Sequence, residues 1–225
     1  ERLRSSPNTR AVNSATLAKL PRLYDTAAEL KSVARSFNVD PARHVYLGSR
    51  ADEGTVKSLD LGAYRVISFA THGLVAGDLD GLDEPALALS APEVTGNSED
   101  GLLTMSEILG LRLNAEWTVL SACNTAAADG EGAEAVSGLG RAFFYAGSRA
   151  LLVSNWPVHS AATTALMTTL FRTQAEHVQL SRAQALQNAR KTLIDQSVYK
   201  NPKGRVVFSY AHPLFWAPFT LIGDG

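Results

Sequence analysis

Short, apolar, β-branched runs that alternate with helical segments constrain the fold of this chain more than any other feature. The clearest runs are Arg65–Ala70, Trp117–Ser121 and Ala150–Ser154. Each is short and almost continuously apolar, which is typical of a strand buried on both faces of a parallel sheet. Apolar residues at helical spacing lie between them. The sequence therefore predicts an α/β fold with about six mostly parallel strands and helices on both faces.

Turn and capping signals define the remaining segments. Thr26–Glu29 and Thr104–Glu107 have the capping-box pattern, and each opens a predicted helix. His44–Gly48 is predicted to be a short strand. Residues 1–20 have no clear period and no internal repeat is evident, so we expect an N-terminal arm or linker remnant followed by one domain over 21–225. Later helices are expected over about 134–145, 160–175 and 181–196.

Composition argues against several classes of protein. The chain has 21 Lys and Arg against 22 Asp and Glu, with no basic block, which argues against a nucleic-acid partner. No apolar run approaches the roughly 20 residues that span a bilayer, so we expect no membrane association. A single cysteine excludes an internal disulfide and a Cys-based zinc cluster, and it suits a reducing, cytoplasmic setting. No His, Asp or Glu grouping has metal-ligand spacing, so we expect no metal and no cofactor.

Because the sequence opens on Glu1, we interpret it as a processed or excised fragment.

Two reactive side chains follow predicted strands. His72 comes just after the strand ending at Ala70, and Cys123 just after the one ending near Ser121. Ligands of such sheets bind outside the carboxyl ends of the strands, so both side chains should emerge at one edge. A nucleophilic thiolate needs a nearby base, and the oxyanion needs backbone donors, for which the Gly73 and Cys123 N–H groups are candidates. The residues alone leave an inert buried thiol and a nucleophile as open alternatives.

Other signals are weaker. Gly130–Ala135 matches the dinucleotide pattern G-x-G-x-x-A, but it begins several residues after its strand, so we reject a Rossmann site. His159 is an alternative base, but it would lie at a helix start, where the dipole disfavours an imidazolium. The acidic segment Asp78–Glu84 is either a solvated loop or a cation-binding or autoinhibitory loop.

Five motifs carry a resemblance to a known family. They are Phe69–Gly73, Leu120–Thr125, Gly138–Gly147, Ser154–Val158 and His212–Phe219. With these motifs in this order over about residues 20 to 224, the chain resembles the CHAT domain family. These are caspase-like domains often found with tetratricopeptide repeats and related to separases in peptidase clan CD. The resemblance implies a caspase-like three-layer sandwich and a cysteine endopeptidase that acts through a thioester acyl-enzyme, with His72 and Cys123 as the catalytic dyad.

The resemblance also implies where a peptide would bind. Ser121, two residues before the nucleophile, would line the pocket for the residue preceding the cleaved bond. Because Ser121 is neutral, a preference for a basic residue there is not predicted, although Asp129 or Glu131 on the following loop are candidates to supply a negative charge. An extended peptide would lie along Asn155 and Trp156.

Family members commonly carry acidic residues after the Trp-x-Val segment, where this chain has His159–Ser160. The expected partners are a protein or peptide substrate and a repeat region or regulatory partner outside this chain. A non-catalytic or latent protein-interaction module with the same fold is the alternative to the enzyme, because its sequence would look the same.

Overall fold

Three parallel strands and one antiparallel strand form the main sheet of the protein. The computed structural model describes residues 14–121, 131–156, 158–196, 198–200 and 203–225. In the sheet order β1-β5-β6-β9, the strands are β1 (Val66–Phe69), β5 (Trp117–Leu120), β6 (Ala150–Ser154) and β9 (Phe219–Gly223). β9 pairs antiparallel with β6, and the other pairs are parallel. The predicted α/β fold with a mainly parallel sheet is confirmed, with four strands in this sheet among the described residues.

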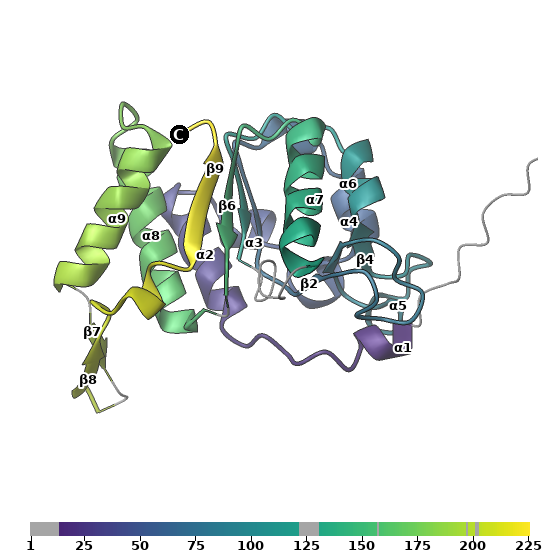
Figure 1. Ribbon diagram of the computed structural model, residues 1–225, viewed down its shortest axis with the longest axis horizontal. Coiled ribbons are helices and arrows are strands. Elements are labelled where there is room, and N and C mark those ends of the chain that lie inside the picture. The colour runs from purple at the N-terminus through teal and green to yellow at the C-terminus, as the bar shows by residue number, and fades with distance from the viewer. Residues whose placement is uncertain (1–13, 122–130, 157, 197, 201–202) are drawn as a thin grey trace, which may run out of the picture.

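Helices cover both faces of the sheet, as Figure 1 shows. One face carries α2 (Thr26–Ser36), α8 (Ser160–Glu176) and α9 (Arg182–Gln196). The other carries α4 (Glu53–Ser58), α6 (Met105–Gly110) and α7 (Glu131–Ala146). The helices expected over 160–175 and 181–196 are confirmed, and the helix expected from residue 134 begins at Glu131.

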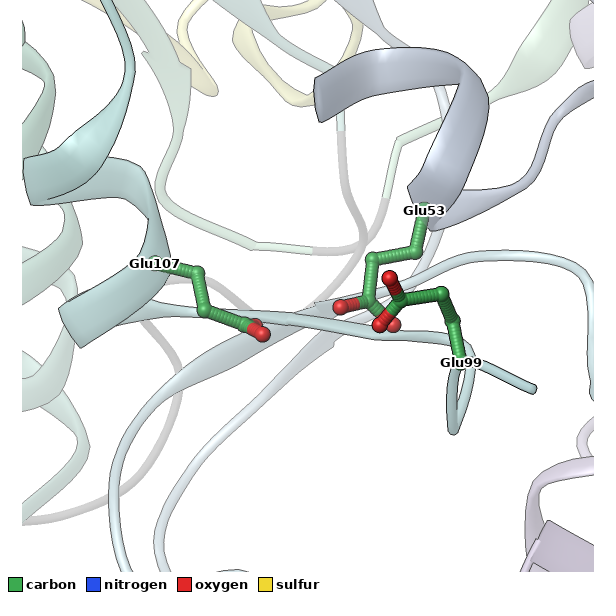
Figure 2. A group of neighbouring side chains, drawn as sticks. All are labelled: Glu53, Glu99 and Glu107. Carbon is green, nitrogen blue, oxygen red and sulfur yellow. The ribbon is translucent and has the colours of Figure 1, made fainter. Parts of the chain in front are cut away.

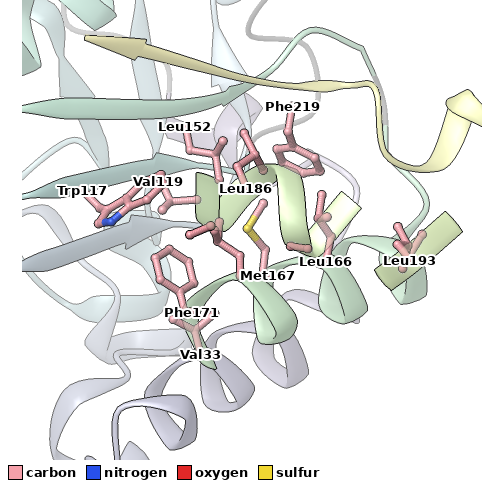
Figure 3. Packing of buried hydrophobic residues seen from close by; sticks show 14 of the residues in the cluster. Val33, Trp117, Val119, Leu152, Leu166, Met167, Phe171, Leu186, Leu193 and Phe219 are labelled. Carbon is pink, nitrogen blue, oxygen red and sulfur yellow. The ribbon is translucent and has the colours of Figure 1, made fainter. Parts of the chain in front are cut away.

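The two faces of the sheet have separate apolar cores because successive residues of a strand point to opposite sides. Val119 packs with Phe171 and Met167 of α8, as Figure 3 shows. Its neighbour Leu120 packs with Phe143 of α7 on the other face. Each such fully buried side chain contributes about 1.5–3 kcal/mol to folding. These cores fix the positions of the strand ends, where the candidate site lies.

Two small sheets lie outside the main one. The first, in the order β2-β3-β4, is antiparallel and contains β2 (Gly73–Leu74), β3 (Ala86–Ala88) and β4 (Leu102–Thr104). The second is the pair β7 (Val198–Lys200) and β8 (Val206–Ser209). The remaining short elements are α1 (Ser14–Leu17), α3 (Pro41–His44), α5 (Pro92–Thr95), η1 (Gly48–Arg50), η2 (Leu61–Ala63) and η3 (Pro213–Phe215). No helix in the described part of the chain is long and apolar enough to cross a membrane.

The predicted strand over His44–Gly48 is wrong. His44 ends the short helix α3, which Asp40 caps by accepting a hydrogen bond from the Ala42 N–H. Val45 and Leu47 do have extended backbones, but they join no sheet among the described residues. An apolar, β-branched segment becomes a strand only where another strand lies beside it, and no described strand pairs with this segment.

One of the two predicted capping boxes is confirmed. Thr104 and Glu107 bond reciprocally at the start of α6. At the start of α2, however, the N-cap is Asp25, and the Thr26 hydroxyl donates to the Leu23 carbonyl instead. Glu29 is buried, with 5% of its surface exposed. The division of the chain at residue 20 stays a prediction.

Candidate active site at the carboxyl edge of the sheet

His72 lies where the chain leaves the main sheet and enters the small one. It follows the last residue of β1 by three positions and immediately precedes β2. Its carbonyl accepts a hydrogen bond from the Ala88 N–H at 2.9 Å, and the neighbouring Thr71 hydroxyl donates to the Ala88 carbonyl. These two bonds join the end of β1 to β3. They hold the half-buried His72 at the carboxyl edge of the sheet.

The strand that precedes Cys123 ends beside this histidine segment. The Ser121 N–H donates to the Phe69 carbonyl at 2.9 Å, which extends the ladder between β1 and β5 by one residue. Ser121 is buried. The two strands therefore end at the same edge of one sheet, as expected. Cys123 and Asp129 lie outside the described residues, so the dyad stays a prediction.

The imidazole of His72 contacts the backbone of Pro21. Its Nε2 atom lies 2.7 Å from the Pro21 carbonyl oxygen. Because a carbonyl oxygen only accepts hydrogen bonds, Nε2 carries the hydrogen in this contact. The neutral ring then has its free lone pair on Nδ1. Sequence reasoning missed Pro21, because a contact through a backbone carbonyl leaves no side-chain signature.

Glu29 of α2 lies beneath the end of β5. The Ser121 side chain is a hydrogen-bonding partner of the Glu29 carboxyl, while Glu29 Oε1 has no partner within the described part of the chain. Burial raises the pKa of this carboxyl to about 7, and the bond from Ser121 opposes that rise. α2 packs along α8, where Ser32 and Thr168 bond at 2.7 Å. The sequence pattern predicted Glu29 to be a capping residue of α2, so its position in the candidate active site was not predicted.

The other predicted site residues take different positions. Asn155 follows β6, and its side-chain amide donates to the Pro218 carbonyl at 2.9 Å and to the Thr220 hydroxyl at 2.6 Å. Asn155 therefore fastens the end of β6 to the start of β9. The adjacent Trp156 is half-buried, and its indole N–H has no partner among the described residues. Glu131 is the first residue of α7.

Comparison with known proteins gives the family. The family model of the CHAT domain matches residues 4–224, which is nearly the whole chain. This chain belongs to the CHAT domain family. It is also 33% identical over 127 residues to tetratricopeptide repeat protein 28 of Mus musculus, an alignment that covers 55% of this chain and 4% of that protein. The CHAT domain family has a caspase-like fold, and the sheet with helices on both faces agrees with it.

In this CHAT domain the alternative base, His159, is used as a helix cap. Its Nδ1 atom accepts a hydrogen bond from the Ala162 N–H at 3.4 Å, at the start of α8 as predicted. Its ring meets those of Phe208 and Phe215 edge-on. The lone pair of the imidazole is therefore engaged in a structural contact, which leaves His72 as the better candidate for a base.

The CHAT domain also contains a group of carboxylates that the spacing of the sequence does not reveal. Glu53, Glu99 and Glu107 converge from α4, a loop and α6, with oxygen atoms within 4.8 Å of one another (Figure 2). The Lys57 ammonium bonds to Glu53, to Glu99 at 3.3 Å and to Glu107 at 2.8 Å. Burial raises the pKa of Glu53 to about 8, while Lys57 lowers the pKa of Glu107. Because the Lys57 ammonium already supplies a cation to all three carboxylates, the group is a structural ion-pair network.

Proposed function

We propose that this CHAT domain is a cysteine endopeptidase in which Cys123 is the nucleophile and His72 the base. The observation that carries the proposal is the contact between His72 Nε2 and the Pro21 carbonyl, 2.7 Å away. A nucleophile and a base oriented by a third group make up the recurring arrangement of covalent catalysis. Relationship to clan CD cysteine peptidases supports the same reaction class.

The chemistry follows from the position of the proton. The His72 Nδ1 lone pair accepts the proton of the Cys123 thiol, and the resulting imidazolium keeps its Nε2–H bond to Pro21. The thiolate attacks the peptide carbonyl carbon, and the imidazolium then protonates the departing amine as the C–N bond breaks. A thioester remains, and water, activated by the neutral His72, hydrolyses it to release the acid and restore the thiol.

The backbone of β2 supports Gly73 as an oxyanion donor. Gly73 is paired with Leu87, and the preceding residue, His72, accepts its bond from Ala88 of β3. Hydrogen-bonded and non-bonded pairs alternate in an antiparallel ladder, so Gly73 directs its N–H away from β3. β2 is an edge strand, so that N–H has no ladder partner among the described strands, and it is the proposed first donor to the oxyanion. The Cys123 N–H is the proposed second donor.

Substrate contacts are proposed on the same edge. The half-buried indole ring of Trp156 is the proposed apolar wall for an extended peptide, next to Asn155. Ser121 lines the pocket for the residue before the cut, with Asp129 or Glu131 as sources of negative charge. The likeness to a tetratricopeptide repeat protein supports a repeat region as the regulatory partner. The single cysteine, which suits a reducing setting, supports a cytoplasmic location.

A peptide-cleavage assay tests the proposal. A library of peptides from a digested proteome is incubated with the wild-type chain and with the C123A, H72A and H177A variants, and new termini are identified by mass spectrometry. His177 is exposed and distant in sequence from the site, so H177A is the matched histidine control. We expect cleavage by the wild type and H177A and its loss in C123A and H72A. Equal cleavage by C123A and the wild type would refute the proposal.

A further inference from the structure

The β7–β8 hairpin (Val198–Lys200 and Val206–Ser209) projects from the body of the protein on the side where β6 ends, as Figure 1 shows. It is held there by His159, the residue that caps α8 shortly after β6. The ring of His159 lies 5.4 Å from that of Phe208, centroid to centroid. Trp156, the proposed peptide wall, precedes His159 by three positions. The hairpin therefore stands at the carboxyl edge of the sheet, next to the segment that is proposed to contact substrate.

The inward face of the hairpin explains why so short a ribbon is folded. Tyr199 of β7 and Phe208 of β8 are cross-strand partners, and their rings stack with centroids 5.0 Å apart. Phe208 also packs against Tyr210 and Phe215, at 5.7 and 5.1 Å between centroids. A two-stranded hairpin is marginally stable by itself, so it needs packing of this kind. The aromatic cluster fixes the direction in which the hairpin projects.

The outward face of the hairpin is apolar and exposed. Side chains alternate along a strand, so Val198 and Lys200 point away from the cluster that Tyr199 joins. Lys200 pairs with Val206, and the register shift at this point leaves Val207 as the extra residue of a bulge. The exposed fractions of Val198, Val206 and Val207 are 39%, 59% and 56%. Apolar side chains gathered on one exposed ribbon, unlike scattered ones, indicate an interaction surface.

The charge of the hairpin specifies the partner. Three basic residues and no acidic one occur between Asp195 and Asp224, namely Lys200, Lys203 and Arg205. All three are exposed, and Lys200 lies beside Val206 in the ladder. The chain as a whole has a net charge of −1, so this positive charge is local. A surface that combines cations with apolar side chains is complementary to a segment that combines carboxylates with apolar side chains.

A protein segment fits this surface better than a lipid bilayer does. Surfaces that insert into membranes present Trp, Phe or Leu to the lipid. In this hairpin the large rings, Tyr199 and Phe208, face inward, and the apolar residues that face outward are valines. Valine packs well against the side chains of an extended neighbouring chain. The preferred occupant is therefore an extended polypeptide segment.

We propose that the outward face of the β7–β8 hairpin is a docking surface for an acidic, apolar segment of the protein substrate, outside the sequence that is cleaved. The valines contact apolar side chains of that segment, and Lys200 and Arg205 attract its carboxylates. Docking next to the carboxyl edge raises the effective concentration of the cleavable bond at Cys123. The identity of the partner as substrate rests on the proposed peptidase function, whereas the docking itself requires no catalysis.

Fluorescence anisotropy with the C123A variant, which has no nucleophile, tests docking separately from cleavage. The probe is the fluorescein-labelled peptide Glu-Val-Asp-Ile-Glu-Val-Asp-Ile, and the comparison peptide has Lys at each acidic position. We expect saturable binding of the acidic peptide and at least about tenfold weaker binding of the Lys peptide. K200E should weaken binding of the acidic peptide at least about fivefold. K31E, at an exposed position on α2, is the matched control and should change it by less than about twofold.

A second variant tests the valines without removing their β-branched shape. V206T combined with V207T keeps the strand propensity of the hairpin and should weaken binding at least about threefold. V178T is the matched control, because Val178 is 76% exposed and follows the opposite end of α8. Binding that K200E and the double threonine variant leave unchanged overturns the proposal. Binding of vesicles of three parts phosphatidylcholine to one part phosphatidylserine, in place of the acidic peptide, assigns the surface to a membrane and also overturns it.

Kinetics connects the docking surface to cleavage. The acidic segment is joined through a Gly-Ser linker to a peptide that the wild type cleaves. We expect the fusion to lower KM at least about fivefold in the wild type but not in K200E, with kcat unchanged in both. Cleavage of the unfused peptide without any effect of the fusion overturns the docking surface and leaves the peptidase intact. Binding by C123A with no cleavage by the wild type refutes the peptidase, and with it the substrate as the partner.

Discussion

Replacing Glu29 by glutamine removes a buried ionisable group while preserving the shape of the side chain. In the folded chain, burial raises the pKa of Glu29 from the ordinary 4.5 to about 7. Since one pKa unit corresponds to 1.36 kcal/mol, this difference makes folding less favourable by about 3 kcal/mol once the group is ionised. Glutamine does not ionise and can still bond to Ser121, so the variant escapes that penalty.

The sign of the effect sets its pH window. Below about pH 4.5 the carboxyl is protonated in both the folded and the unfolded chain, and it imposes no penalty. Between 4.5 and about 7 the unfolded chain releases the proton first, which favours unfolding as the pH rises. Above 7 the full penalty of about 3 kcal/mol is present. The stability of the wild type should therefore fall relative to E29Q between pH 5 and pH 8.

Urea unfolding followed by tryptophan fluorescence at pH 5, 6, 7 and 8 measures this difference. E176Q serves as the control, because Glu176 is exposed near the end of α8. Comparison with the wild type at each pH cancels contributions from other titrating groups, including Glu53. From pH 5 to pH 8, the difference in unfolding free energy between E29Q and the wild type should grow by about 2–3 kcal/mol in favour of E29Q. The same difference for E176Q should stay constant. A gain for E29Q below about 0.5 kcal/mol would show that the Glu29 carboxyl is not held in a desolvated position.

Two further predictions concern packing and charge elsewhere. G147A should lower the free energy of unfolding by about 3 kcal/mol or more, because Gly147 has a φ of +113° and an added Cβ would lie 2.2 Å from the Leu113 carbonyl oxygen. G110A, with open space around it, should change stability by less than about 1 kcal/mol in the same urea assay, and equal effects would contradict the steric argument. K57Q should cost about 1–3 kcal/mol, and more at pH 8 than at pH 5, because it leaves three neighbouring carboxylates without their shared ammonium. Exposed Lys31 gives the control K31Q, and a cost for K57Q no larger than for K31Q would contradict the network.

The helices and strands that have a local sequence pattern could be predicted from the sequence alone. β1, β5 and β6 are continuous apolar runs, and α8 and α9 follow from helical spacing, so their positions were predictable. The error at His44–Gly48 has a physical cause. Strand propensity is expressed through pairing, and the neighbour that this segment needs is absent from the described sheet.

The candidate site was only partly predictable for a related reason. The rule for strand ends placed His72 at the carboxyl edge of the sheet, because it depends on chain order alone. Ser121 was proposed only through the resemblance to the CHAT family. Pro21 and Glu29 reach the site through the path of the chain into α2, far from His72 and Ser121 in sequence. Contacts of this kind depend on tertiary packing, so no characteristic residue spacing in the sequence predicts them. The same holds for Lys57 and its carboxylates.

The rate of Cys123 alkylation by iodoacetamide, measured against pH, tests the central claim most directly. The chain has one cysteine, so every labelling event is assigned without ambiguity. We expect the wild type and H177A to react at pH 6–7 at least about tenfold faster than H72A, with the rates converging above about pH 9, where a free thiol is itself ionised. Wild type and H72A reacting alike, both with the pH profile of a free thiol, would contradict the His72–Cys123 dyad.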